Sequence, residues 1–105
     1  MFARVTLLEI DTVRTSIDEA LMLFRTQTLE RLRSQPGYCG MWVLASPEGK
    51  GLLMSLWETE AEASAEGDHS FYAEELGRFM TLFRSPPGRD RYEVVFAEDV
   101  APQPG

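Results

Sequence analysis

The chain has 105 residues, 44% of them hydrophobic, and a formal net charge of −7. This length suits one domain. The acidic balance argues against nucleic acid and anionic membranes as partners, because proteins bind both through lysine and arginine. Cys39 is the single cysteine, which excludes an internal disulfide and suits a reducing, cytoplasmic location. No apolar run approaches the roughly 18 residues of a membrane helix, and the start of the chain lacks the apolar core of a signal peptide.

The first third of the chain predicts a strand followed by a long helix. Residues 2–10 alternate between two faces, as in a β-strand. A helix is expected to begin at Ser16, which is spaced from Glu19 as in a capping box. Its apolar stripe runs at helical spacing to about residue 32. Pro36 and Gly37 then end the helix, because neither suits its continuation.

The remainder predicts three more strands and two more helical segments. Residues 38–46 and 51–58 read as strands joined by the tight turn PEGK, which makes a hairpin. Helix propensity is high over 59–67, and a better helix is expected over 70–84. Residues 91–98 predict the last strand.

This β-α-β-β-α-β order indicates a ferredoxin-like α+β domain, with four antiparallel strands and the helices on one face. We assign the domain to residues 1–98 and expect residues 99–105 to form a flexible tail.

Both faces of the predicted sheet are apolar. In the third strand, Leu52, Met54 and Leu56 share one face, whereas Leu53 and Trp57 share the other. Two helices cover only one face of such a sheet, and an uncovered apolar face would exceed what monomers usually expose. We therefore expect a homodimer formed through the open sheet face.

Four stretches of sequence resemble the antibiotic biosynthesis monooxygenase family, within the dimeric α/β-barrel superfamily. They are ARV near the start, QPGYCG, LWETE and YEVVF, in the family's order and spacing over roughly residues 2–98. The resemblance implies the fold derived above, a face-to-face dimer, and a pocket within each protomer between sheet and helices. It also implies a monooxygenase, free of cofactor and metal, that oxidises a small planar aromatic or quinol-type molecule with O₂.

Two other functions are compatible with the same fold. The first is a non-catalytic homodimer that binds a small apolar ligand or has a stress-related role. The absence of a tight polar cluster in the sequence favours it. Haem degradation fits less well. That branch of the family uses an early asparagine, the tryptophan of the third strand and a histidine on the second main helix. This chain has no asparagine, and its one histidine, His69, precedes that helix.

Four residues are candidates for the chemistry of a site. Trp57 could stack on an aromatic substrate, or it could close the core where the third strand meets the next helix. Tyr72 and Tyr38 could each orient a substrate through the phenol, or pack with the hydroxyl at the rim. His69 suits a general base, because the pKa of histidine lies near neutrality.

Further residues are candidates for binding the substrate. Trp42 and Phe79, like Tyr38, are candidates for contacting the substrate, and the apolar stripes of the helices are expected to wall the pocket. Arg78 could hold an anionic intermediate, although Glu74, one turn earlier, favours a solvated ion pair. Cys39 is expected to be a small buried apolar residue. Nothing in the sequence resembles a metal site.

Overall fold

The computed structural model describes residues 1–64, 77, 79–84 and 88–98. Within them, four strands form one antiparallel sheet in the order β2-β3-β1-β4. The strands are β1 (Phe2–Glu9), β2 (Tyr38–Ala45), β3 (Lys50–Trp57) and β4 (Gly88–Glu93). This is the strand order of a ferredoxin-like α+β fold, as the sequence predicts.

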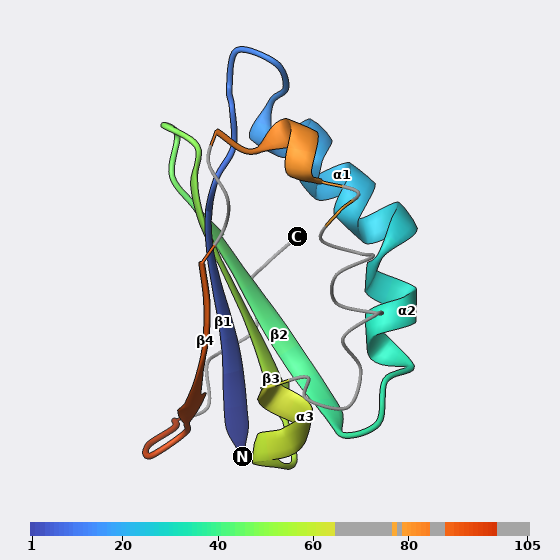
Figure 1. Ribbon diagram of the computed structural model, residues 1–105, viewed down its shortest axis with the longest axis vertical. Helices are drawn as coiled ribbons and strands as arrows, with labels where there is room; N and C mark the ends of the chain where they lie inside the picture. The colour runs from blue at the N-terminus through green and yellow to red at the C-terminus, as the bar shows by residue number, and fades with distance from the viewer. Residues whose placement is uncertain (65–76, 78, 85–87, 99–105) are drawn as a thin grey trace.

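The described helical segments form a second layer beside the sheet (Figure 1). They are α1 (Ile17–Gln27), α2 (Leu29–Arg33), α3 (Glu60–Ser64) and the 3₁₀ turn η1 (Met80–Leu82). Helices α1 and α2 run along the length of the sheet, and α3 sits at the end where β3 finishes (Figure 1). No helix in the described part of the chain is long and apolar enough to span a membrane.

Strand β1 is one of the two inner strands, and its pairing shows which side chains share each face of the sheet. It pairs with β3 from Phe2↔Trp57 to Glu9↔Lys50, and with β4 from Phe2↔Glu93. Alternation along these strands places one set of side chains toward the helices and the other set on the opposite, open face. Exposed hydrophobic side chains on the open face are Leu7, Trp42 and Tyr92.

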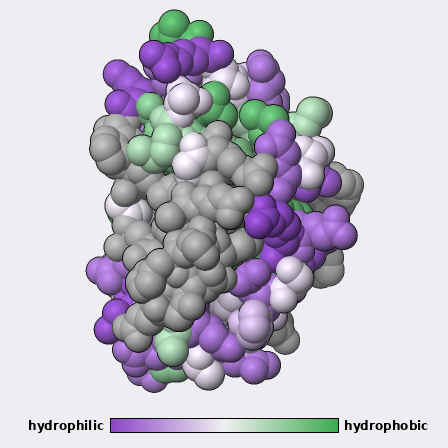
Figure 2. Space-filling model, turned by 45° about the vertical axis from the view of Figure 1, so that its right-hand side comes forward, coloured by the Kyte–Doolittle hydropathy of each residue, from purple (hydrophilic) through white to green (hydrophobic). Residues whose placement is uncertain are grey.

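The helix side presents a mixed surface. Figure 2 shows it mostly hydrophilic along the lower part, with hydrophobic groups gathered toward the upper end. On the other side of the sheet, the exposed Leu7, Trp42 and Tyr92 make the open face apolar in one chain, and its pairing with a second chain remains a prediction.

The long helix expected from Ser16 is interrupted at Thr28, where φ is −119°. Its start is as predicted, because the Ser16 hydroxyl accepts the Glu19 backbone N–H at 3.0 Å. Near the break, the Thr26 hydroxyl donates to the Met22 carbonyl at 2.9 Å. A hydrogen bond from a threonine hydroxyl to a carbonyl of the preceding turn tends to bend a helix. Threonine is also β-branched, and β-branched residues have a lower helix propensity. The prediction of one continuous helix is therefore wrong.

Helix α3 begins with a complete capping box. The Glu62 carboxylate accepts the Thr59 backbone N–H at 3.1 Å, and the Thr59 hydroxyl accepts the Glu62 N–H at 3.2 Å. The same carboxylate lies against Gly37, where a Cβ atom would collide with it. Gly37 also has φ of +78°, which favours glycine. Residues 65–67, the rest of the segment predicted as helical, lie outside the described part.

The predicted last strand is displaced. Strand β4 ends at Glu93 because its partner β1 begins at Phe2, so residues 94–98 have no strand opposite them. The Val94 N–H still donates to the Met1 carbonyl at 2.9 Å, but Val95 and Phe96 are 88% and 82% exposed. The strand predicted over residues 91–98 is therefore wrong over most of its length.

The helix predicted over residues 70–84 also ends earlier than expected. Phe83 is extended, with ψ of 145°, and forms an isolated bridge with Ile10. The Arg84 N–H donates to the Glu9 carbonyl at 2.9 Å, which fixes this segment beside the end of β1. Residues 70–76 and 78 lie outside the described residues.

Cys39 is exposed, which contradicts the expectation that it is buried. The register of β2 against β3 shifts between Tyr38 and Gly40, so Cys39 is the extra residue of a β-bulge. Gly40 has φ of +141° at this bulge. Bulges are not visible in an alternating pattern, which is why the sequence did not reveal the exposure.

Candidate functional site

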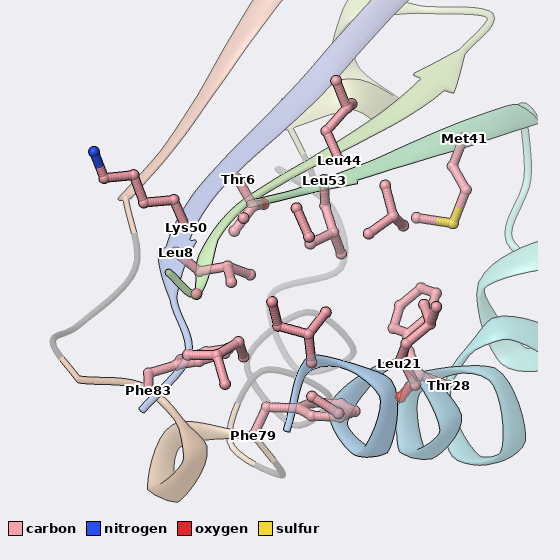
Figure 3. A pocket seen from close by; sticks show the side chains of 18 of the residues that line it. Thr6, Leu8, Leu21, Thr28, Met41, Leu44, Lys50, Leu53, Phe79 and Phe83 are labelled. Carbon is pink, nitrogen blue, oxygen red and sulfur yellow. The ribbon is translucent and has the colours of Figure 1, made fainter. Parts of the chain in front are cut away.

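A cavity of about 150 Å³ lies between the helix side of the sheet and α1 (Figure 3). Its floor is formed by strand side chains that alternation places inward: Leu8, Met41 and Leu53. Leu21 and Phe24 of α1 lie opposite this floor. The described lining is therefore almost entirely apolar.

Aromatic rings close one end of the cavity. Phe79 and Phe83, on either side of η1, both line it (Figure 3). The rings of Phe24 and Phe79 are 6.5 Å apart between centroids and tilted by 50°, a favourable aromatic arrangement. These rings shield the space from water at the side of η1.

Among the described lining residues, the one buried charge, on Arg4, is directed toward α3. Its Nε donates to the Ala63 carbonyl and its Nη2 to the Glu62 carbonyl, both at 2.8 Å. These carbonyls belong to the last turn of α3, where the helix dipole favours a cation. The guanidinium also lies 4.6 Å from the centroid of the Trp57 ring. Arg4 therefore holds α3 against β1.

The other polar lining groups are also committed or directed elsewhere. The Ser55 hydroxyl accepts the indole N–H of Trp57 at 2.8 Å. Thr6 and Thr28 are buried, and each already interacts with other protein groups. The ammonium group of Lys50 points away from the cavity in Figure 3. Among the described lining residues, none is poised to move a proton.

Trp57 is in the core and is not one of the residues that line the cavity. It is 2% exposed and packs with Leu32 and Ala63. Tyr38 meets its ring edge-to-face, with centroids 5.6 Å apart. This placement corresponds to the packing alternative for Trp57, in which it closes the core between β3 and α3.

The remaining candidates are scattered. Tyr38 does not line the cavity, and burial raises its pKa above the usual value, while the Arg33 guanidinium opposes that shift. Trp42 pairs with Met54 on the open face, so it lies on the opposite side of the sheet from the cavity. A contact between Trp42 and a molecule in the cavity is not compatible with this position. Phe79 lines the cavity, and its contact with a substrate remains a prediction.

Three candidates, Tyr72, His69 and Arg78, lie outside the described residues. Their proposed roles therefore remain predictions.

Arg4 and Ser55 were not identified as site residues from the sequence. A signal existed for both, because each is a polar residue at an inward position of an apolar, alternating strand. Arg4 shares its face with Thr6 and Leu8, and Ser55 lies between Leu53 and Trp57 on its own strand face. Buried polar groups of this kind need partners, which the structure supplies through α3 and the indole.

The described residues contain no group of three or more His, Cys, Asp or Glu that could hold a metal ion.

Comparisons with known proteins identify the fold. No family model matches the sequence, and no curated protein matches it. Solved structures do match. A protein of Bordetella bronchiseptica, proposed to be an antibiotic biosynthesis monooxygenase, superposes with a TM-score of 0.71 at 15% identity, over 90% of this chain and 97% of that one.

Two further structures are similar over nearly the whole chain. A monooxygenase from the gene ActVA-Orf6 of Streptomyces coelicolor, in complex with nanaomycin D, has a TM-score of 0.69 at 18% identity, over 97% of this chain and 92% of that one. A protein of unknown function from Nitrosomonas europaea has a TM-score of 0.70 at 21% identity, over 96% and 95%. The chain thus has the fold of the antibiotic biosynthesis monooxygenases, and the resemblance noted in the sequence is confirmed at that level.

Proposed function

We propose that this chain, which has the antibiotic biosynthesis monooxygenase fold, takes a small apolar or aromatic molecule into the cavity between the sheet and α1. The observation that carries the proposal is the apolar lining. Leu53 on the floor faces Leu21 and Phe24 on α1 around about 150 Å³ of space. Burial of an apolar ligand there is favourable, because it removes apolar surface from water. The S. coelicolor monooxygenase, which has a similar fold, forms a complex with the ligand nanaomycin D, and this supports ligand binding as a use of the fold.

We further propose that the bound molecule is a quinol-type aromatic and that O₂ oxidises it without metal or cofactor. One oxygen atom enters a ring C–H bond, and the other leaves as water with two hydrogens from the quinol. The protein would orient the ring between apolar walls and exclude bulk water. A proton acceptor would come from Tyr72 or His69, which lie outside the described residues.

The alternative is a non-catalytic protein that binds a small apolar ligand in the same cavity. One observation favours it: the Arg4 guanidinium, the buried charge of the described lining, already donates to the carbonyls of Glu62 and Ala63. We also propose that two chains pair through the open face of the sheet, since Leu7, Trp42 and Tyr92 are exposed there.

Oxygen uptake with 1,4-hydroquinone, measured with an oxygen electrode, separates the two functions. An enzyme should consume O₂ in proportion to protein concentration. Filling the cavity with Leu53→Trp should abolish the uptake, whereas Val13→Trp, on the exposed connection before α1, should leave it unchanged. Binding without uptake would support the non-catalytic alternative. If no apolar ligand enters the cavity at all, the proposal is wrong.

A further inference from the structure

We infer that the described lining of the cavity favours a neutral molecule with a single ring over anionic and fused-ring molecules. The inference rests on the proposed function, because it assumes that a small molecule enters this cavity. It goes further by naming the charge and the size that the described residues accept.

Size is the first reason. The cavity measures about 150 Å³. A protein cavity of about that volume, lined by Leu, Ile and Phe, stays dry and binds benzene. The lining here is of the same kind, with Leu21, Leu53 and Phe24 facing one another across the space. A fused second ring would exceed this volume, so it would have to displace the walls, which packed interiors resist, or extend out of the open side of the cavity.

Charge is the second reason. The Arg4 guanidinium already donates to the Glu62 and Ala63 carbonyls at 2.8 Å. The Lys50 ammonium points away from the cavity (Figure 3). A ligand carboxylate or phenolate would therefore lose its hydration without gaining a cation from these two side chains. Burying a charge in this way is strongly unfavourable.

The polar lining still permits a small neutral group. The Ser55 hydroxyl accepts the Trp57 indole N–H, and its own O–H remains a donor for an oxygen atom on a ligand. A hydroxyl or carbonyl on a single ring could meet that donor. The chemistry of the cavity therefore favours a phenol, quinol or quinone in its uncharged form.

Methionine methyl groups provide a direct test in the intact protein. Met41 lines the cavity, whereas Met54 lies on the open face and Met22 is 67% exposed on α1. With ¹³C-methyl-methionine labelling, titration with toluene should shift the Met41 resonance saturably and leave Met22 and Met54 in place. Benzoate, the anionic analogue, should bind at least about 100-fold more weakly. Naphthalene should bind at least about tenfold more weakly than toluene.

Paired variants on one strand test whether volume sets this preference. Leu53→Ala enlarges the cavity and should improve naphthalene binding about tenfold, whereas Leu52→Ala, on the other face, should not. If naphthalene binds the unaltered protein as well as toluene does, the size argument is overturned. If benzoate binds the unaltered protein as well as toluene does, the charge argument is overturned. In either case the proposed function stands. If no probe shifts Met41, both the inference and the proposed function fail.

Discussion

The Arg4 guanidinium lies 4.6 Å from the centroid of the Trp57 ring and donates two hydrogen bonds to the last turn of α3. One side chain on the central strand thus joins the buried end of β3 to the helix that follows it. Replacement by Met keeps the length but removes the charge and both donors. We expect the free energy of unfolding to fall by about 2–4 kcal/mol.

Urea denaturation measures this loss, and Arg91→Met is the matched control. Arg91 also reaches α3, through a 3.0 Å ion pair with Glu60, but both side chains are largely exposed. Exposed pairs contribute about 0–1 kcal/mol. Equal losses for the two variants would show that burial of Arg4 adds nothing.

Ser55→Ala should destabilise the protein by about 1–3 kcal/mol, because it leaves the buried indole N–H of Trp57 without its acceptor. The control is Ser64→Ala, whose hydroxyl makes an exposed bond to the Ala61 carbonyl, and which should change stability by less than about 0.5 kcal/mol. Thermal unfolding followed by circular dichroism compares them. An unchanged melting temperature for Ser55→Ala would contradict the argument.

Gly37→Ala and Gly40→Ala should both destabilise the protein, and only the loss at Gly37 should depend on Glu62. Both positions have positive φ, so both substitutions strain the backbone by about 1–3 kcal/mol. Only at Gly37 would the new methyl group also meet the Glu62 carboxylate, whereas Gly40 has open space. A second change, Glu62→Ala, should recover part of the loss in Gly37→Ala and none in Gly40→Ala. Chemical denaturation of the four proteins tests this coupling.

Tyr38 should ionise at higher pH than a free tyrosine, because burial raises its pKa. A group whose pKa is higher in the folded state contributes stability that is fully present below the unfolded value of about 10 and is lost as pH rises through the folded pKa. The tyrosinate absorbance titration should therefore lose a component that titrates above the free-tyrosine value in Tyr38→Phe. The decline in unfolding free energy above about pH 10 should also become shallower. A titration unchanged by the substitution would refute this.

Leu7→Glu should keep the protein monomeric if two chains pair through the open face. Leu7 is 57% exposed there, and a carboxylate at a buried apolar interface is strongly unfavourable. Light scattering coupled to gel filtration should report a dimer for the natural sequence and a monomer for the variant. Val13→Glu, on the connection before α1 and 94% exposed, is the control and should leave the dimer intact. A natural sequence that is monomeric at all concentrations would refute the pairing.

Alternation and turn residues were enough to predict the order of the strands. The hairpin around PEGK, the cap at Ser16 and the inward set of β1 all follow from local rules that the tertiary structure does not override. The end of β4 could not be predicted in this way. The end of β4 depends on the residue at which β1 begins. Because β1 is distant in sequence, the residue types at 94–98 do not indicate where that pairing stops.

The site was harder to predict than the fold for a related reason. Aromatic residues were the natural candidates, yet Trp57 lies in the core and Trp42 lies on the far face of the sheet. The cavity is formed instead mainly by aliphatic residues such as Leu53 and Leu21, whose pattern is the same whether they enclose a space or fill it. Only the spacing between the sheet and α1 distinguishes these cases.

The central place of β1 also has a consequence for how the chain folds. Its two neighbours, β3 and β4, are distant in sequence, and β4 is the last strand described. During synthesis, one edge of β1 stays without its partner until residues 88–93 have emerged, and pairings of such long separation fold slowly. The first strand to be made is thus among the last to be completed, and in that interval a second nascent chain can compete for its edge.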